Sequence, residues 1–164
     1  MINPATMQST HVAAQLARHG PYSYRLDATV PRFADDKPLI VFDGVCVLCS
    51  RFAEMVAWRD HDHTFRFTAA QSPLGQALFV HYGLDPINFE TNLLVEGGIA
   101  FGKMDAFARI VPHLGGVYRV AAVVRALPRP LADWLYDRIA QNGLFGRRET
   151  CVVPGPHWQG RIIG

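Results

Sequence analysis

The sequence predicts an α/β domain, and three observations support this fold class. Short apolar runs typical of strands alternate with stretches in which apolar residues recur at helical spacing, from about residue 38 onward. The alternation begins as strand, helix, strand, an order that forms a right-handed crossover between parallel strands. Hydrophobic residues make up 49% of the 164 residues, which is enough to bury one sizeable core.

The first three elements follow from their apolar patterns. The run Leu39-Ile40-Val41-Phe42 predicts a buried strand. An apolar stripe predicts a helix over about 47–59; its members are Leu48, Phe52, Met55 and Val56. After a return through His61-Asp62-His63, the alternation in Thr64–Thr68 predicts a second strand.

The next elements have clear boundary signals. Ser72 is placed to cap a helix with Pro73 at its first position, and this helix should end near Tyr82-Gly83. Residues 92–96 and 99–101 flank Gly97-Gly98 and predict a β-hairpin. A further amphipathic helix follows, marked by Met104, Phe107, Ala108 and Val111. The whole order is βαβ, helix, ββ hairpin, helix, which is the thioredoxin-like plan.

The flanks of this core are less regular. Residues 1–37 show no clear period beyond a short helix at about His11–Arg18, so we predict a flexible or loosely packed N-terminal extension there. We expect one domain over 38–164, with its core at about 38–113. Two more apolar stripes, Val117–Val124 and Leu131–Ile139, predict a C-terminal helical extension, followed by an irregular tail, within 114–164.

Composition narrows the functional classes. A formal net charge of +2 is too small to indicate a nucleic-acid partner. The most apolar late stretch is interrupted by Arg119 and Arg125, so we expect no membrane span, and the N-terminus lacks the apolar segment of a signal peptide. Three cysteines do not form a disulfide framework. The expected location is therefore the cytoplasm, where a Cys-x-x-Cys pair indicates redox catalysis or metal binding.

Such a pair lies where the first strand gives way to the first helix. Cys46 and Cys49 are one helical turn apart in the segment Phe42-Asp43-Gly44-Val45-Cys46-Val47-Leu48-Cys49. A helix N-terminus favours a thiolate, so Cys46 is the expected nucleophile and Cys49 the expected resolving thiol. Asp43 is expected either to accept a proton from Cys49, or to cap the helix or bond the Gly44-Val45 turn. No cofactor beyond the cysteines is expected.

These residues carry a resemblance to a known family. The segment Asp43-Gly44-x-Cys46-x-x-Cys49 resembles the motif of the DCC family, described as predicted thiol–disulfide oxidoreductases. The C-terminal half is similar as well, in 128–137, Ile139-Ala140-x-Asn142, Phe145-Gly146 and Cys151 before Pro154. The resemblance covers about Pro38 to Ile163 and implies a thiol- or disulfide-containing substrate, either a protein or a small molecule.

Two features bear on how the pair would work. The dipeptide Val47-Leu48 adds no positive charge beside Cys46, which predicts a moderately or strongly reducing couple. Thioredoxin-like enzymes place a cis-proline before the third strand, whereas residues 89–92 here hold no proline. Thr91 or Asn92 is expected to occupy that place, and the missing proline leaves a non-catalytic binding module as a second candidate function.

The third cysteine and two further motifs also allow different interpretations. Cys151 is either a packed thiol or a partner or relay for Cys46. A zinc site built from Cys46, Cys49, Cys151 and His157 has suitable ligands but no second paired motif. The stretch Gly97–Met104 nearly matches a phosphate-binding loop, but Met104 replaces the Mg²⁺-binding hydroxyl, and a hairpin explains the stretch better.

Overall fold

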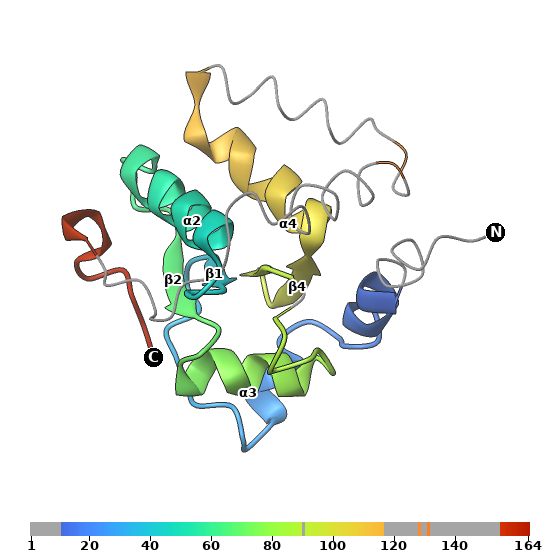
Figure 1. Ribbon diagram of the computed structural model, residues 1–164. Helices are drawn as coiled ribbons and strands as arrows, with labels where there is room; N and C mark the ends of the chain where they lie inside the picture. The colour runs from blue at the N-terminus through green and yellow to red at the C-terminus, as the bar shows by residue number, and fades with distance from the viewer. Residues whose placement is uncertain (1–10, 90, 117–127, 129–130, 132–154) are drawn as a thin grey trace.

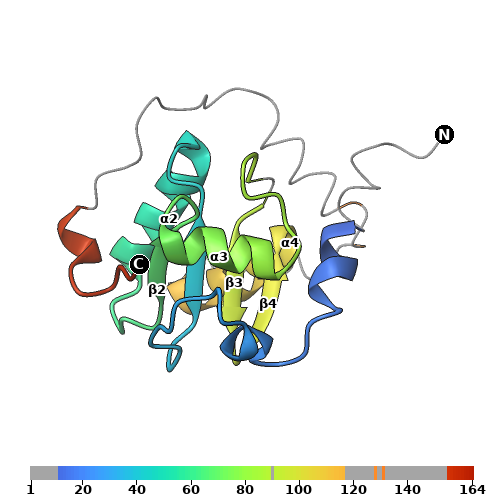
Figure 2. The same ribbon diagram turned by 90° about the horizontal axis from the view of Figure 1, so that it is seen from below.

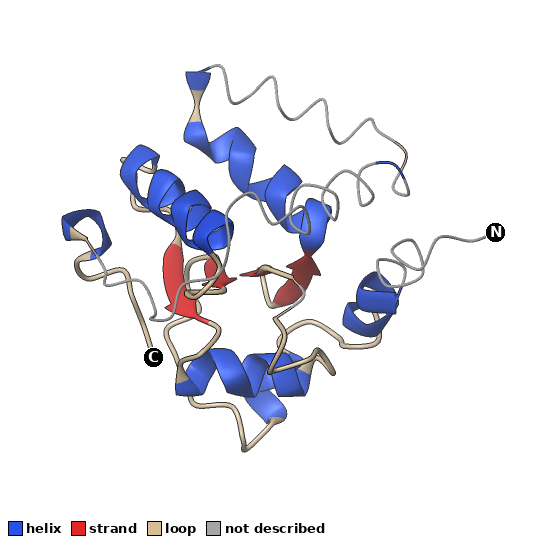
Figure 3. Ribbon diagram, in the orientation of Figure 1, coloured by secondary structure: helices blue, strands red, loops and turns tan. Residues whose placement is uncertain are grey.

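The computed structural model describes residues 11–89, 91–116, 128, 131 and 155–164. Within these parts of the chain, a four-stranded sheet lies between two layers of helices (Figure 3). Helices α2 (Val47–Arg59) and α4 (Lys103–Ile110) cover one face, and α3 (Pro73–His81) covers the other (Figures 1 and 2). The predicted α/β class is confirmed, and the arrangement agrees with a thioredoxin-like fold. The helical extension predicted over 117–139 falls almost wholly outside the described residues.

The sheet has the predicted mixture of parallel and antiparallel pairs. Its strands are β1 (Leu39–Phe42), β2 (Arg66–Ala69), β3 (Leu93–Glu96) and β4 (Ile99–Gly102), in the order β2-β1-β3-β4. The β1–β2 pair is parallel, as the crossover through α2 requires, and the other two pairs are antiparallel.

The glycines between β3 and β4 explain the tight hairpin. Gly97 and Gly98 have φ angles of 57° and 80°, and two consecutive positive values are what a two-residue type I′ turn requires. Residues 99–102 pair with β3 instead of forming a loop around a phosphate. The hairpin interpretation of this stretch is therefore confirmed.

Strand β1 is central and buried on both faces. Leu39 and Val41 belong to the hydrophobic cluster on the α3 side, whereas Ile40 and Phe42 belong to the cluster under α2 and α4. This alternation follows from the two-residue period of a strand, and burial on both faces explains why its sequence is continuously apolar. The carboxyl end of β1, where α2 begins, is thus held in the middle of the molecule.

The described residues before β1 pack against the domain. Residues 11–16 are helical, and the buried members of this segment join the α3-side cluster: Val12, Leu16, Tyr24 and Val30. The short helix η1 (Ser23–Leu26) is held to the end of α3, because the two ring nitrogens of His81 lie 2.9 Å from Ser23 Oγ and 2.8 Å from Asp27 Oδ2. The domain boundary at residue 38 stays a prediction.

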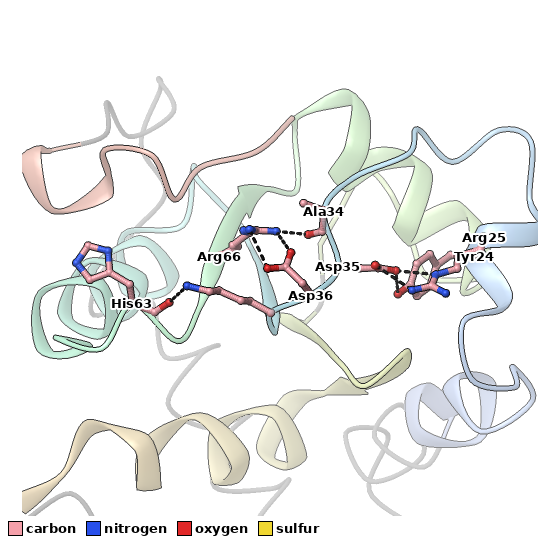
Figure 4. Close-up of polar contacts among 8 residues, drawn as sticks. Tyr24, Arg25, Ala34, Asp35, Asp36, His63 and Arg66 are labelled. Atoms are coloured by element: carbon pink, nitrogen blue, oxygen red, sulfur yellow. Dashed lines mark hydrogen bonds and ion pairs between the residues drawn. The ribbon is translucent and has the colours of Figure 1, made fainter.

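Polar contacts fix the connection into β1 (Figure 4). Arg66 Nη1 donates to the Ala34 carbonyl at 2.6 Å and pairs with Asp36 at 2.5 Å. Tyr24 Oη donates to Asp35 at 2.8 Å. The start of β1 is therefore tied both to β2 and to η1.

The last ten residues lie along the free edge of β2. Ile162 forms a parallel bridge with Phe67, and the indole of Trp158, on the short helix η4 (Pro156–Trp158), lies against the rings of Phe42 and Phe67. A second short helix, η2 (Val111–Leu114), follows α4. In the described portion of the chain, no helix combines the length and apolarity needed to cross a bilayer.

Candidate functional site

The candidate site begins where β1 ends. After Phe42 the chain turns through Asp43, Gly44 and Val45, and α2 starts at Val47 with Cys46 as its N-cap. The helix spans the predicted residues, 47–59. Because β1 is the buried central strand, this turn and the first turn of α2 start from a rigid base.

A glutamine in the connection after the neighbouring strand β2 holds the turn in place. Gln71 Nε2 donates to Asp43 Oδ1 at 2.6 Å, and Gln71 Oε1 accepts from the Gly44 N–H at 3.0 Å. The same Asp43 oxygen accepts from the Val45 N–H at 2.9 Å. Sequence reasoning missed Gln71; the available signal was its position just after β2, since carboxyl ends of parallel strands meet at one edge of a sheet.

Cys46 lies in an environment that stabilises its thiolate. Its sulfur accepts a hydrogen bond from the Cys49 backbone N–H at 3.4 Å, and both cysteines are free thiols in this structure. The pKa of Cys46 is lowered to about 6, chiefly by the hydrogen bond from the Cys49 thiol and further by the backbone N–H groups of Cys49 and Leu48. Burial and the charge of Asp43 oppose this shift. At neutral pH the sulfur of Cys46 is therefore mostly a thiolate.

Cys49 is held in the opposite state. Its pKa is raised, first by its hydrogen bond to Cys46, then by burial, and then by the negative charges of Cys46 and Asp43. A side-chain hydrogen bond from Asn92 acts in the other direction and lowers it. The two thiols thus form an unequal pair, in which the pKa of Cys46 is lowered and that of Cys49 is raised.

Asp43 lies beside this pair. Its side chain is buried, with 2% of its surface exposed, and it bonds the Val45 N–H in the turn, as one of its two predicted roles requires. Its charge acts on the pKa of both cysteines. The structure therefore brings together all three residues predicted for the site, and a proton-accepting role for Asp43 stays a prediction.

Thr91 and Asn92 occupy the place before β3. The described residues contain no cis peptide bond. Thr91 Oγ1 donates to the Asn92 carbonyl at 2.9 Å and accepts from the Lys103 N–H at 2.7 Å. The Asn92 side chain reaches Cys49, while its buried Oδ1 accepts no hydrogen bond from the described part of the structure. Asn92, one of the two residues expected at this place, thus lies next to Cys49.

The zinc site considered from the sequence cannot be assembled from the described residues alone. Cys151 lies outside them, and His157 is exposed on η4. Among the residues that the structure places, no three His, Cys, Asp or Glu side chains gather as a metal site would need. Both interpretations of Cys151, as a packed thiol and as a partner or relay for Cys46, stay predictions.

Comparisons with known proteins agree with the geometry of the site. The family model described as DCC1-like thiol-disulfide oxidoreductase matches residues 40–144. The uncharacterized protein YuxK of Bacillus subtilis is 33% identical over 127 residues, which cover 76% of this chain and 93% of that protein. A chloroplastic DCC family protein of Arabidopsis thaliana is 31% identical over 122 residues, covering 73% of this chain and 71% of that protein.

No solved structure matches this chain. The family match covers more than half of the chain and includes the turn, both cysteines and β3. The chain belongs to the DCC1-like thiol-disulfide oxidoreductase family.

Proposed function

We propose that this chain is a thiol–disulfide oxidoreductase that cycles Cys46 and Cys49 between dithiol and disulfide, acting on protein or small-molecule thiols. The observation that carries the proposal is the state of the Cys46 sulfur. It caps α2, accepts the Cys49 N–H at 3.4 Å and has a pKa of about 6. Because the thiolate is the attacking species in thiol–disulfide exchange, such a cysteine is ready to react at neutral pH.

The reaction would proceed in two exchanges. The Cys46 thiolate attacks one sulfur of a substrate disulfide, forms a mixed disulfide and releases the other substrate sulfur as a thiolate. Cys49 then loses its proton and attacks the Cys46 sulfur, which releases the second substrate thiolate and leaves a Cys46–Cys49 disulfide. Two molecules of an external thiol, or one external dithiol, then reduce the Cys46–Cys49 disulfide and are themselves joined as a disulfide. The electrons come from the two cysteines alone, so the cycle requires no further cofactor.

We assign Asp43 the role of accepting the Cys49 proton. Its carboxylate is buried, lies in the turn next to Cys46 and acts electrostatically on both sulfurs. A carboxylate in such a site is suited to general base work. Gln71 is assigned a positioning role, since it holds both Asp43 and the Gly44 N–H.

A glutathione redox titration with mass-spectrometric mapping of alkylated cysteines tests the proposal. We expect a reversible two-electron transition confined to Cys46 and Cys49. A nucleophile of pKa about 6 is more acidic than that of thioredoxin and less acidic than that of strong periplasmic oxidants. The potential should therefore lie above about −270 mV, the value of thioredoxin, and well below the roughly −120 mV of a strong oxidant, as a moderately reducing couple would. Cys46→Ser should abolish the transition, whereas Cys151→Ser should leave it unchanged.

Two outcomes would favour a different function. The absence of a cis peptide bond among the described residues favours a non-catalytic binding module, and a missing reversible disulfide would support that function. Stoichiometric zinc, with thiols that react only after chelation, would support the metal site.

A cytoplasmic location remains the expectation from the cysteine content, although one relative is named as chloroplastic. We expect no nucleic-acid partner.

A further inference from the structure

Asn92 is fixed in place beside the cysteine pair by the sheet. Leu93, the first residue of β3, pairs with Val41 of β1, so Asn92 lies at the end of β1 from which the chain turns toward Cys46. The hydroxyl of Thr91 donates to the Asn92 carbonyl and also accepts the Lys103 N–H, at 2.9 and 2.7 Å. The backbone that carries Asn92 is therefore held from two sides.

Within the described residues, only one end of the Asn92 side-chain amide has a hydrogen-bond partner. Its contact with Cys49 lowers the pKa of that thiol, which requires the amide N–H to be the donor and the sulfur the acceptor. The carbonyl oxygen Oδ1 is buried, and no described residue donates to it. A buried acceptor without a partner destabilises a fold, so an asparagine kept here only for stability would be a poor choice.

The charges around Cys49 change during the proposed cycle. In the dithiol, the pKa of Cys49 is raised chiefly by the hydrogen bond to Cys46, then by burial and by the charges of Cys46 and Asp43. Once Cys46 forms a mixed disulfide it carries no charge, so neither its hydrogen bond nor its charge raises the pKa of Cys49 any longer. Burial and the charge of Asp43 still oppose ionisation of Cys49. The hydrogen bond from Asn92 favours ionisation.

We propose that the Asn92 amide donates its N–H to the Cys49 sulfur during resolution of the mixed disulfide, and so acts as a catalytic residue of the second exchange. In that step Cys49 gives its proton to a base, and its sulfur electron pair forms the bond to Cys46. The substrate sulfur departs with the electrons of the broken bond. This inference depends on the proposed function, because it concerns a step of the same cycle.

An aromatic disulfide separates the two exchanges. Reduced protein in a Cys151→Ser background is mixed with dithiobis(nitrobenzoate), whose coloured thiolate is released once when Cys46 attacks and again when Cys49 resolves. Stopped-flow absorbance then follows two phases in the same trace. Asn92→Leu and Asn92→Asp remove the N–H donor, and Asn88→Leu changes an exposed asparagine of the same loop.

We expect the second phase to slow about threefold in Asn92→Leu, and by more in Asn92→Asp, whose carboxylate adds a negative charge beside Cys49. Loss of a hydrogen bond to the charged sulfur lowers the thiolate fraction of Cys49 about tenfold. The less acidic thiolate is about threefold more nucleophilic, which leaves a net slowing of about threefold. The pH midpoint of the second phase should rise in both variants. The first phase should not change, since Asn92 is absent from the contacts that set the Cys46 pKa.

Stability distinguishes this role from a structural one. Asn92→Leu removes a buried amide oxygen that no described residue satisfies and loses only a hydrogen bond to sulfur, a weak acceptor, so it should unfold near the temperature of the parent. Asn88→Leu should leave both phases unchanged. An unchanged second phase in both Asn92 variants would overturn the inference while leaving the redox function intact. A parent protein that shows only the first phase would instead overturn the proposed function.

Discussion

At the residue scale, the site depends on one sulfur that serves as a helix cap. An N-cap side chain usually accepts a backbone N–H with an oxygen, and here the Cys46 sulfur accepts the Cys49 N–H instead. The side chain that caps the helix is thus the same group that we propose as the nucleophile. Ionisation of Cys46 strengthens this bond, which links the local fold to the reactivity of the thiol.

The acidity of Cys46 can be read from its alkylation rate. We expect the rate constant with iodoacetamide to rise as pH increases through about 6 and to level off above it, because only the thiolate reacts. In Asp43→Asn the midpoint should move to lower pH, since the Asp43 charge raises the Cys46 pKa. Asparagine keeps the Oδ1 acceptor for Val45 and Gln71, so the turn should persist.

Two controls accompany this profile. Cys46→Ser should remove the reactive phase near pH 6, leaving Cys49, whose pKa is raised in the presence of Cys46. Mass spectrometry should find the first label on Cys46. A midpoint close to the ordinary cysteine value, or one that Asp43→Asn does not shift, would contradict the assigned electrostatics.

The predictable part of the site is the local part. Asp43, Cys46 and Cys49 lie in one short segment, so their spacing and the helix boundary could be read from the sequence. Gln71 reaches them through the parallel pairing of β1 with β2, and Asn92 through the antiparallel pairing of β1 with β3. Register between distant strands depends on how the two faces of the sheet pack, which a single sequence does not specify.

At the element scale, one strand begins later than its pattern predicts. The alternation favoured Thr64–Thr68, whereas β2 spans Arg66–Ala69. The reason is the buried carboxylate of Asp60, whose oxygens accept the N–H groups of Thr64 and Phe65 at 3.0 and 2.9 Å. Those amides end the α2 connection and are not available to the sheet.

Helix α3 meets the end of β2 at a point where no side chain fits. A Cβ on Gly75 would lie 2.2 Å from the Ala69 carbonyl oxygen and 2.7 Å from the Ala70 Cα, both of them backbone atoms. Alanine ordinarily stabilises a helix relative to glycine by about 1 kcal/mol. Here the clash should outweigh that gain, because neither partner is a flexible side chain.

We therefore expect Gly75→Ala to lower the free energy of unfolding by about 1–3 kcal/mol, the usual cost of overpacking. Urea unfolding followed by circular dichroism measures this change. Gly20→Ala is the matched control, since a Cβ there meets nothing within 4 Å, and it should unfold with the parent. Equal midpoints for the two variants would show that α3 can shift away from β2.

At the scale of the whole molecule, both edges of the sheet are covered by segments from the ends of the chain. Tyr22 N–H donates to the Gly98 carbonyl at 2.8 Å in the hairpin, and the side chains of Val12 and Leu16 surround Gly102 on β4. At the opposite edge, Phe67 exchanges backbone hydrogen bonds of 2.9 Å with Arg161 and Ile163. Covered edges prevent strand pairing with other chains.

These segments were the least predictable part of the fold. The buried side chains among residues 11–37 occur singly and at irregular intervals, so no periodic pattern in the sequence indicates them. The last ten residues likewise form one bridge and one short helix. The central elements have continuous patterns of burial, whereas the terminal segments acquire their structure only from the surface on which they lie.

A buried ion pair anchors the C-terminal segment. The guanidinium of Arg161 pairs with Asp60, and both side chains are almost fully buried, with 5% and 2% of their surfaces exposed. Arg161 also donates to the carbonyls of Ala57 and Phe65, at 2.9 and 3.2 Å. This one side chain therefore connects the end of α2, the start of β2 and the last residues of the chain.

Removing the buried Arg161 cation should lower the free energy of unfolding far more than removing an exposed cation. Arg161→Met leaves the Asp60 carboxylate buried without its partner, and such a change typically costs about 3–5 kcal/mol. Asp60→Asn should also destabilise, while the double variant should lose less than the sum, because neither charge is then left alone. Arg25→Met, which breaks an exposed pair with Asp35, should change stability little. Urea unfolding of the four variants measures the coupling energy between Arg161 and Asp60. If the losses in the free energy of unfolding were additive, the two charges would be solvated independently. The C-terminal segment would then be held by Trp158 and the β2 bridge instead.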